Sequence, residues 1–208
     1  MPTLTPSDSA RIDRAALRRG LLERRLRLTD RAGRENALGA SLIRVLQTLQ
    51  PACIGAYCAT RGEFDPLPTL EAFRERAPET RLALPVVEPA SRGMRFVAWD
   101  PGDTLRVGPY DIAEPVRQDE DVAPDVLLLP CVGFLDIGLR LGYGGGYYDR
   151  YLGRHPEVFT IGLAFDDCRV ECLDSQPHDR LLDVILTETA AFGIEAGIAQ
   201  VHPSHPPI

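Results

Sequence analysis

Short, strongly apolar runs alternate along the chain with longer segments in which apolar positions recur at helical spacing. Residues 126–129 read Val-Leu-Leu-Leu and are followed by Pro130, and residues 159–165 are almost as apolar. Runs of this length that end at chain breakers are typical of buried strands. The shorter runs at 53–59, 81–86 and 182–187 predict three further strands.

Two amphipathic segments precede the first predicted strand. The first is expected to form a helix that is capped by Ser7 or Asp8 and ends near Leu28. The second is expected to form a helix that is capped by Thr29 and ended by Pro51.

A small β-hairpin is predicted in the middle of the chain. Its strands would be residues 94–99 and 104–107, joined by the Pro101-Gly102 turn. Residues 111–124 are acidic and broken by prolines, so we expect them to form a connecting loop.

The order of these elements predicts the fold class. A third helix fits residues 69–76, and strands and helices alternate along the chain. This alternation indicates one α/β domain with an open, mostly parallel sheet and flanking helices, a three-layer arrangement of Rossmann-like type. The domain is expected to span residues 1–190 and to be followed by a C-terminal tail at 191–208.

Composition places the chain among ordinary globular proteins. Its 208 residues are 44% hydrophobic and 25% charged. No apolar run approaches the ~20 residues of a membrane span, and the N-terminus lacks the apolar core of a signal peptide. The five cysteines include no CxxC pair, so we expect reduced thiols in a cytoplasmic protein.

Charge narrows the possible ligands. The net charge of −7 argues against nucleic acid as the main partner. All 23 basic residues are arginine, and nine of them lie between Arg11 and Arg34. This segment could present a solvated helical face, an RNA-binding helix pair, or a phosphate site in which Arg14 and Arg18, four residues apart, act together.

Residues 126–152 carry the most unusual backbone chemistry. A predicted strand is followed by a loop with four glycines between Gly142 and Gly146, and then by a helix that can begin at Tyr147. Free backbone N–H groups and a helix dipole that point at one place make an anion site. Tyr147-Tyr148 stands where a Walker loop needs Lys-Ser or Lys-Thr, and the loop comes too late in the chain for a dinucleotide fingerprint. A tight turn that requires positive φ is the alternative.

Three carboxylates are candidates for chemistry. Asp149, in the first turn of the predicted helix, could stabilise the helix dipole or bind Mg²⁺ together with substrate phosphates. Asp179 could then supply a second carboxylate. Glu63 lies just past the end of a predicted strand, where ligands bind in open α/β sheets, although a loop glutamate is often merely solvated.

The glycine-rich segment closely resembles a family signature. Residues 138–150, Gly-x-Arg-Leu-Gly-Tyr-Gly-Gly-Gly-Tyr-Tyr-Asp-Arg, resemble the signature of the 5-formyltetrahydrofolate cyclo-ligases, also called methenyltetrahydrofolate synthetases. Weaker similarities follow the order of that family along the chain: Arg14-x-x-Leu17-Arg18, Tyr57 through Glu63, Glu114-Pro115, residues 161–165, His178-Asp179 through Asp183, and Thr187-Glu188.

The resemblance implies a function. It implies a ligase that uses ATP and Mg²⁺ to close 5-formyltetrahydrofolate to 5,10-methenyltetrahydrofolate, by phosphorylation of the formyl oxygen and attack of N10. Its partners would be the folate and ATP, with no nucleic acid or membrane, and the protein would be a monomer. A paralogue of the same fold that binds nucleotide or folate without cyclisation is the alternative.

The resemblance also assigns residues. ATP would contact Arg14, Arg18, Arg140, Leu141, Gly142, Tyr143, Gly144, Gly145, Gly146, Tyr147 and Tyr148. The folate would contact Cys58, Glu63, Tyr143, Gly144, Gly145, Gly146 and Tyr147. Arg140 and Tyr147 would be catalytic, and Asp149 and Asp179 would bind Mg²⁺. The chain departs from the family in having Arg14 in place of lysine, and Phe134-Leu135-Asp136 in place of a Phe-Asp pair.

Overall fold

We describe the fold from a computed structural model, in which residues 13–177 and 179–195 are described. The helices are α1 (Arg14–Leu26), α2 (Arg31–Leu49), α3 (Leu67–Arg74) and α4 (Tyr147–Arg154), with short 3₁₀ turns η1 (Pro109–Asp111) and η2 (Asp166–Cys168). The strands are β1 (Cys53–Gly55), β2 (Arg81–Glu88), β3 (Gly93–Ala98), β4 (Leu105–Val107), β5 (Ala113–Pro115), β6 (Asp121–Val122), β7 (Val126–Pro130), β8 (Gly133–Phe134), β9 (Arg140–Leu141), β10 (Phe159–Leu163), β11 (Val184–Leu186) and β12 (Ala191–Phe192).

The central sheet is mixed but mostly parallel, as predicted. Its strand order is β12-β11-β10-β7-β1-β2-β3-β6. The five strands from β11 to β2 are parallel, whereas β12, β3 and β6 join antiparallel at the two sides. Two separate two-stranded ribbons, β4-β5 and β8-β9, complete the strands of the described residues.

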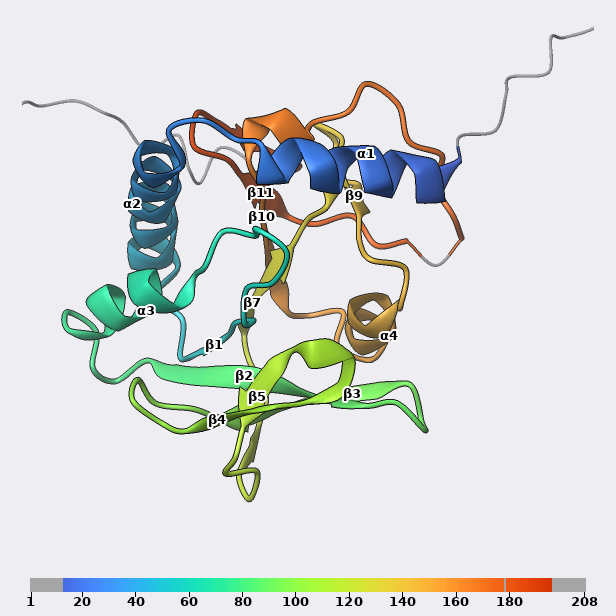
Figure 1. Ribbon diagram of the computed structural model, residues 1–208. Helices are drawn as coiled ribbons and strands as arrows, with labels where there is room; N and C mark the ends of the chain where they lie inside the picture. Colours follow the sequence, from blue (N-terminus) through green and yellow to red (C-terminus); the bar gives the residue numbers. More distant parts are fainter. Residues whose placement is uncertain (1–12, 178, 196–208) are drawn as a thin grey trace, which may run out of the picture.

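Helices cover both faces of this sheet. In Figure 1, α2 and α3 lie on one side of the sheet strands and α4 on the other. The apolar run of β7 explains this arrangement, because Leu128 packs into the core under α2 and α3 whereas Leu127 and Leu129 pack into the core under α4. A strand buried on both faces needs a continuous apolar run, which is the pattern of residues 126–129.

The predicted helix starts require correction. The first described helix begins at Arg14, and the side chain of Asp13 accepts hydrogen bonds from the N–H groups of Ala15 and Ala16. The predicted caps Ser7 and Asp8 lie outside the described residues. The second helix begins at Arg31 after Asp30, not after Thr29.

The predicted β-hairpin is wrong. Residues 93–98 pair with β2 along six positions, from Ala83–Ala98 to Glu88–Gly93. The next strand, β4, pairs instead with β5, inside the segment expected to be a loop. The Pro101-Gly102 sequence does make a turn, but a turn alone does not determine which strand its flanks pair with, and the long β2 provides many more contacts.

The sheet includes residues beyond the predicted end of the domain at residue 190. Residues 191–192, placed in the predicted tail, form β12 and pair with Ile185 and Leu186 of β11. The rest of the tail beyond residue 195 lies outside the described residues, and the domain boundary stays a prediction. Among the described helices, none combines the length and apolarity needed to cross a membrane.

Candidate active site

One cavity of about 940 Å³ opens at the carboxyl ends of the parallel strands. The segment after β1 contributes Tyr57, Cys58 and Glu63, and β7 contributes its last residue, Pro130. Residues 142–149, the glycine loop and the first turn of α4, form another side of the cavity. Helix α1 reaches it with Arg14 and Arg18. Ligands of open α/β sheets bind at this position.

The glycine loop presents unused backbone donors to this cavity. None of the N–H groups of residues 143–146 donates a hydrogen bond to another described residue. Gly144 has φ +95° and Gly146 has φ +66°, which L side chains rarely adopt. Gly146 precedes α4 without any side-chain cap. Loop and helix N-terminus therefore form the anion cradle that the glycine spacing predicts.

Two arginines of α1 approach the loop as predicted. The Nε of Arg18 donates to the carbonyl oxygen of Gly142 at 2.7 Å, and its guanidinium lies 3.5 Å from the position of a Cβ on Gly144. Partial burial and the neighbouring Arg14 cation lower the pKa of Arg18. Arg14 binds Asp179 through both terminal nitrogens, at 2.9 and 3.4 Å, and the carbonyl of Asp174 at 2.8 Å. This forked contact is one that a lysine at position 14 could not make.

Arg140 and Asp149 form a buried ion pair beside the loop. The Nη2 of Arg140 donates to Oδ1 of Asp149 at 2.7 Å, and the two side chains are 6% and 16% exposed. The Nε of Arg140 is buried without a hydrogen-bond partner among the described residues, and the guanidinium lies 5.8 Å from the ring centre of Tyr148. Asp149 therefore has a structural contact that neither the dipole interpretation nor the metal interpretation includes.

Glu63 is buried rather than solvated. Its Oε1 accepts from the hydroxyl of Tyr143 at 2.6 Å, and its Oε2 accepts from the backbone N–H of Thr60 at 2.7 Å. Burial raises the pKa of this carboxyl, and these two hydrogen bonds oppose the rise. A carboxylate has about four acceptor sites, so Glu63 can still accept hydrogen bonds from a ligand.

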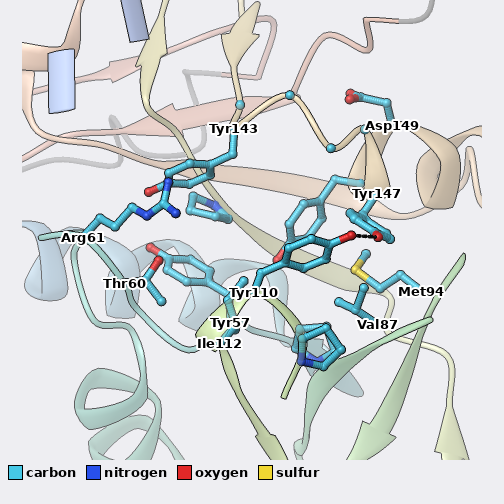
Figure 2. Close-up of a pocket in the computed structure, with 18 of the residues that line it drawn as sticks. Tyr57, Thr60, Arg61, Val87, Met94, Tyr110, Ile112, Tyr143, Tyr147 and Asp149 are labelled. Atoms are coloured by element: carbon cyan, nitrogen blue, oxygen red, sulfur yellow. Dashed lines mark hydrogen bonds between the residues drawn. The ribbon is translucent and has the colours of Figure 1, made fainter. Parts of the chain in front are cut away.

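A tyrosine from the β4-β5 ribbon reaches across to the start of α4. The hydroxyl groups of Tyr110 and Tyr147 are 2.6 Å apart and share a hydrogen bond. Figure 2 shows the two side chains pointing toward each other, with this bond as a dashed line. Tyr110 and Asp111, at the tip of the ribbon, have φ values of 62° and 58°. Nothing in the sequence pattern indicated Tyr110 as a site residue, because it lies between the predicted strand at 104–107 and the predicted loop at 111–124 and belongs to no recognised motif.

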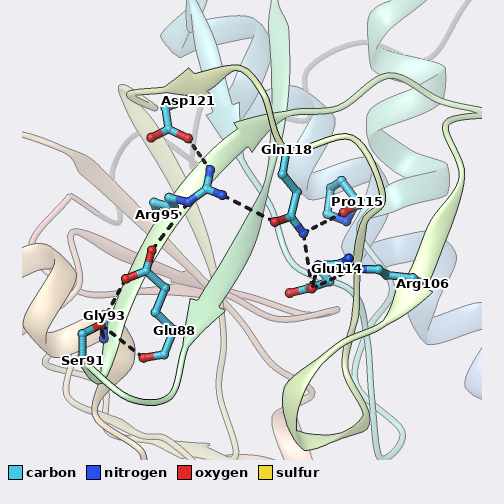
Figure 3. Close-up of polar contacts among 9 residues, drawn as sticks. All are labelled: Glu88, Ser91, Gly93, Arg95, Arg106, Glu114, Pro115, Gln118 and Asp121. Atoms are coloured by element: carbon cyan, nitrogen blue, oxygen red, sulfur yellow. Dashed lines mark hydrogen bonds and ion pairs between the residues drawn. The ribbon is translucent and has the colours of Figure 1, made fainter.

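The same ribbon places a buried carboxylate on the cavity wall. Glu114 accepts from Nε and Nη2 of Arg106 at 3.1 and 2.8 Å, and from Gln118 at 3.3 Å. Figure 3 shows Gln118 between Glu114 and Arg95 of β3, whose Nη2 donates to Oε1 of Gln118 at 3.4 Å. Sequence reasoning noted Glu114 only as part of the resemblance and gave it no role.

Nearly all the predicted site residues meet at this cavity. Those that line it are Arg14, Arg18, Cys58, Glu63, Arg140, Gly142, Tyr143, Gly144, Gly145, Gly146, Tyr147, Tyr148, Asp149 and Asp179. Leu141 is not among the lining residues, since its side chain is fully buried in a small apolar cluster with Leu21 and Leu139. Burial also raises the pKa of the Cys58 thiol to about 11, so this side chain is uncharged at neutral pH.

The N-terminal arginines do not form one solvated face. Arg25 is only 2% exposed, and Arg31 donates to the carbonyl oxygens of Gly62 and Glu63. Arg34 pairs with both Asp167 and Glu188. Three of these arginines thus hold other parts of the protein, and the solvated-face interpretation is wrong for Arg25.

The predicted metal ligands are suitable for magnesium. Asp149 and Asp179 line the same cavity, each beside an arginine. No cluster of three or more metal-binding side chains occurs in the part of the chain that the structure describes. Mg²⁺ typically takes only one or two carboxylates and completes its octahedron with phosphate oxygens and water, so this pair fits the ion.

The cavity lies at the carboxyl ends of parallel strands and is lined by an anion cradle, so the class defined by fold and site is an α/β protein with a site suited to anionic ligands. The class can be narrowed further by comparison. The sequence model of the 5-formyltetrahydrofolate cyclo-ligase family matches residues 10–188. The chain therefore belongs to this family of ligases.

Individual relatives agree with this assignment. The chain is 33% identical over 146 residues to the 5-formyltetrahydrofolate cyclo-ligase of Escherichia coli strain K12. This match covers 67% of this chain and 79% of the relative. The chain is 26% identical over 160 residues to that of Haemophilus influenzae, covering 73% and 84%.

Solved structures share the fold. The NMR structure of Aquifex aeolicus 5,10-methenyltetrahydrofolate synthetase matches with a TM-score of 0.71 and 30% identity, over 94% of this chain and all of that one. The synthetase of Mycoplasma pneumoniae matches in fold with a TM-score of 0.69 and 23% identity, over 85% and 99%.

Proposed function

We propose that this protein uses ATP and Mg²⁺ to convert 5-formyltetrahydrofolate to 5,10-methenyltetrahydrofolate. One observation carries the proposal: a single cavity holds both a buried carboxylate, Glu63, and a glycine loop with Arg14, Arg18 and Arg140 around it. The first suits the N–H groups of a pterin and the second suits phosphates. Two substrates that must react with each other need such adjacent subsites.

The reaction has two steps. The formyl oxygen attacks the γ-phosphorus of ATP, an O–P bond forms, and ADP leaves. The N10 nitrogen then attacks the activated formyl carbon and loses its proton, and phosphate leaves as the methenyl bridge forms. Phosphoryl transfer depends mainly on positioning and charge stabilisation, so no covalent nucleophile from the protein is needed.

The nucleotide side of the cavity would supply positive charge. The terminal nitrogens of Arg18 donate to no other described residue, since only its Nε is engaged. With the N–H groups of residues 143–146, they can bind phosphate oxygens. Arg140 lies beside the loop, where a guanidinium stabilises the charge that builds up on the transferred phosphoryl group. The hydroxyl of Tyr147, shared with Tyr110, can donate to the same oxygens.

The folate side would be built on Glu63. Its carboxylate would accept hydrogen bonds from the pterin, and Cys58, Tyr143 and the loop glycines would contact the same ligand. Mg²⁺, when bound, would supply positive charge that offsets the negative charge of the phosphates. Asp149 and Asp179 would hold it, while Arg140 and Arg14 fix the orientation of these two carboxylates.

The test is an absorbance assay with matched variants. Purified protein with 5-formyltetrahydrofolate and MgATP should produce the near-ultraviolet absorbance of the methenyl product, with one ADP per product. A Glu63→Gln variant should weaken folate binding about tenfold or more, because a hydrogen bond to a charged acceptor contributes about 1.5–3 kcal/mol. Glu71→Gln, on the exposed surface of α3, should behave as the wild type.

Two results would contradict the proposal in different ways. Absence of ATP-dependent product at every folate concentration would refute cyclisation. If ATP or folate still bound in calorimetry, the protein would be the non-cyclising paralogue. An unchanged folate affinity in Glu63→Gln would refute the assignment of Glu63 alone.

A further inference from the structure

Arg25 is a fully buried cation that lies behind the wall of the cavity and contacts Tyr143, one of the residues that line it. It is 2% exposed. Its four hydrogen bonds within the described residues connect α1 to three other segments of the chain. Its Nε and Nη2 donate to the carbonyl oxygen of Arg61 at 3.2 and 3.0 Å, and its Nη1 donates to that of Cys131 at 3.3 Å. Its Nη2 also donates to the hydroxyl oxygen of Tyr143 at 2.6 Å.

This last contact fixes the direction of the tyrosine proton. A tyrosine hydroxyl has one hydrogen to donate, and Arg25 can only donate. Since Arg25 occupies a lone pair of the Tyr143 oxygen, the hydroxyl hydrogen is left for Oε1 of Glu63, 2.6 Å away. Arg25, Tyr143 and Glu63 thus form a directed chain of two short hydrogen bonds from a cation to a carboxylate.

Arg25 also supports the second donor to Glu63. The N–H of Thr60 donates to Oε2 at 2.7 Å from a turn in which Arg61 and Gly62 have φ values of 49° and 74°. A positive φ at a non-glycine residue such as Arg61 is strained and needs external support. The hydrogen bonds of Arg25 to the Arg61 carbonyl provide that support.

We propose that Arg25 is a positioning residue that acts through Tyr143 to hold Glu63 ionised and correctly oriented for the folate. The part of this statement that concerns the folate rests on the function proposed above. The chain Arg25–Tyr143–Glu63 also joins the folate side to the glycine loop, because Tyr143 belongs to that loop. Figure 2 shows the Arg61 side chain beside the ring of Tyr143, where its guanidinium lies 5.4 Å from the ring centre.

The ionisation of Glu63 depends on groups from several elements. Those that act on it are Arg25 from α1, Thr60 from its own turn, Tyr143 from the glycine loop, Tyr148 from α4, Tyr57 after β1 and Cys131 after β7. Burial raises the pKa of all four of the tyrosine and cysteine groups among them, so these stay neutral. Two further cations lie nearby: Arg31 from α2 donates to the backbone carbonyl of Glu63, and Arg61 lies beside the ring of Tyr143.

Removal of the tyrosine hydroxyl tests the proposal. Tyr143→Phe keeps the ring but takes away the donor to Glu63, so the carboxylate loses stabilisation and its pKa should move upward. The control is Tyr151→Phe, whose ring is buried under β3 away from the cavity. Difference infrared titration of each variant against its own Glu63→Gln counterpart isolates the Glu63 carboxyl band. An upward shift in Tyr143→Phe alone is expected, and an unchanged titration would overturn the proposal.

A double-mutant cycle tests whether Arg25 acts through Tyr143. Arg25→Lys keeps the positive charge but loses the fork that joins Arg61 and Tyr143. It should shift the Glu63 titration upward in the wild-type background and much less in the Tyr143→Phe background. Equal shifts in both backgrounds would show that Arg25 does not act through the tyrosine. Arg27→Lys, at an exposed arginine just past α1, is the matched control.

Kinetics provide the functional reading. As the pH falls, protonation of Glu63 should raise the KM for the folate. In Tyr143→Phe this rise should begin at a higher pH than in the wild type, because the pKa of Glu63 is raised. Near that pKa the KM should be about tenfold above the wild-type value, with a smaller change in kcat. A uniform loss at every pH would contradict a role through ionisation. If the wild type proves inactive, the proposed function fails, but the infrared titrations still decide whether Arg25 and Tyr143 set the ionisation of Glu63.

Discussion

The buried pair of Arg140 and Asp149 allows a direct test of the site, with Asp149→Ala as the perturbation. Arg140 is 6% exposed, and Asp149 is its one ion-pair partner among the described residues. The truncation leaves a guanidinium buried without a counter-charge. Measurement in the presence of a chelator removes any contribution from bound metal, so the change in unfolding free energy reports the pair alone.

The magnitude follows from burial. Breaking a fully buried ion pair by removal of one partner typically costs about 3–5 kcal/mol. Because Asp149 is 16% exposed and the cavity admits water, we expect a cost at or just below the lower limit of this range, about 2–3 kcal/mol. For a chain of this length that corresponds to a fall in Tm of about 4–12 °C.

The assay is chemical and thermal unfolding of three variants. Arg140→Met combined with Asp149→Ala should recover most of the loss, since it removes the stranded charge. Asp136→Ala breaks a half-exposed pair with Arg169 and should cost less than about 1 kcal/mol. If Asp149→Ala unfolded with the same free energy as the Asp136→Ala control, the reasoning about burial would be refuted.

Two further predictions concern the loop and the thiols. Gly144→Ala places a side chain at φ +95°, at a cost of about 1–2 kcal/mol, and should weaken ATP binding in calorimetry. Gly153→Ala within α4 should leave ATP binding near that of the wild type and raise stability by up to about 1 kcal/mol. Native protein should react rapidly with one equivalent of an aromatic disulfide reagent at pH 8, at the exposed Cys172. The other four cysteines are buried, and burial raises the pKa of each of their thiols, so little of their thiolate forms at this pH; two or more fast equivalents would contradict this.

The sequence predicts the elements of the fold better than their pairing. Residues 126–129 identify a strand buried on both faces, because no surface strand tolerates such a run. The partner of residues 93–98 was predicted wrongly, since the Pro101-Gly102 turn is a local signal and the pairing with β2 is decided by side-chain packing over its whole length. Monomeric state and cytoplasmic location stay predictions.

The candidate site shows the same division. The glycine loop and its following helix are contiguous in sequence, so spacing and residue type suffice to predict an anion cradle. The role of Arg25 could not be predicted in this way. Its partners Arg61 and Tyr143 lie 36 and 118 residues further along the chain, and only the fold brings them to it. The burial of Glu63 likewise depends on Tyr143, which crosses from another segment.

The two outermost strands of the sheet have a consequence for aggregation. Within the described residues, β6 and β12 form the edges, and each is only two residues long. Exposed edges of β-sheets are templates on which further chains can add strands, and very short edge strands offer few N–H and C=O groups for such pairing. The long, strongly apolar strands such as β7 and β10 are thereby kept in the interior of the sheet. The fold should consequently resist edge-to-edge polymerisation even though its central strands are rich in β-forming residues.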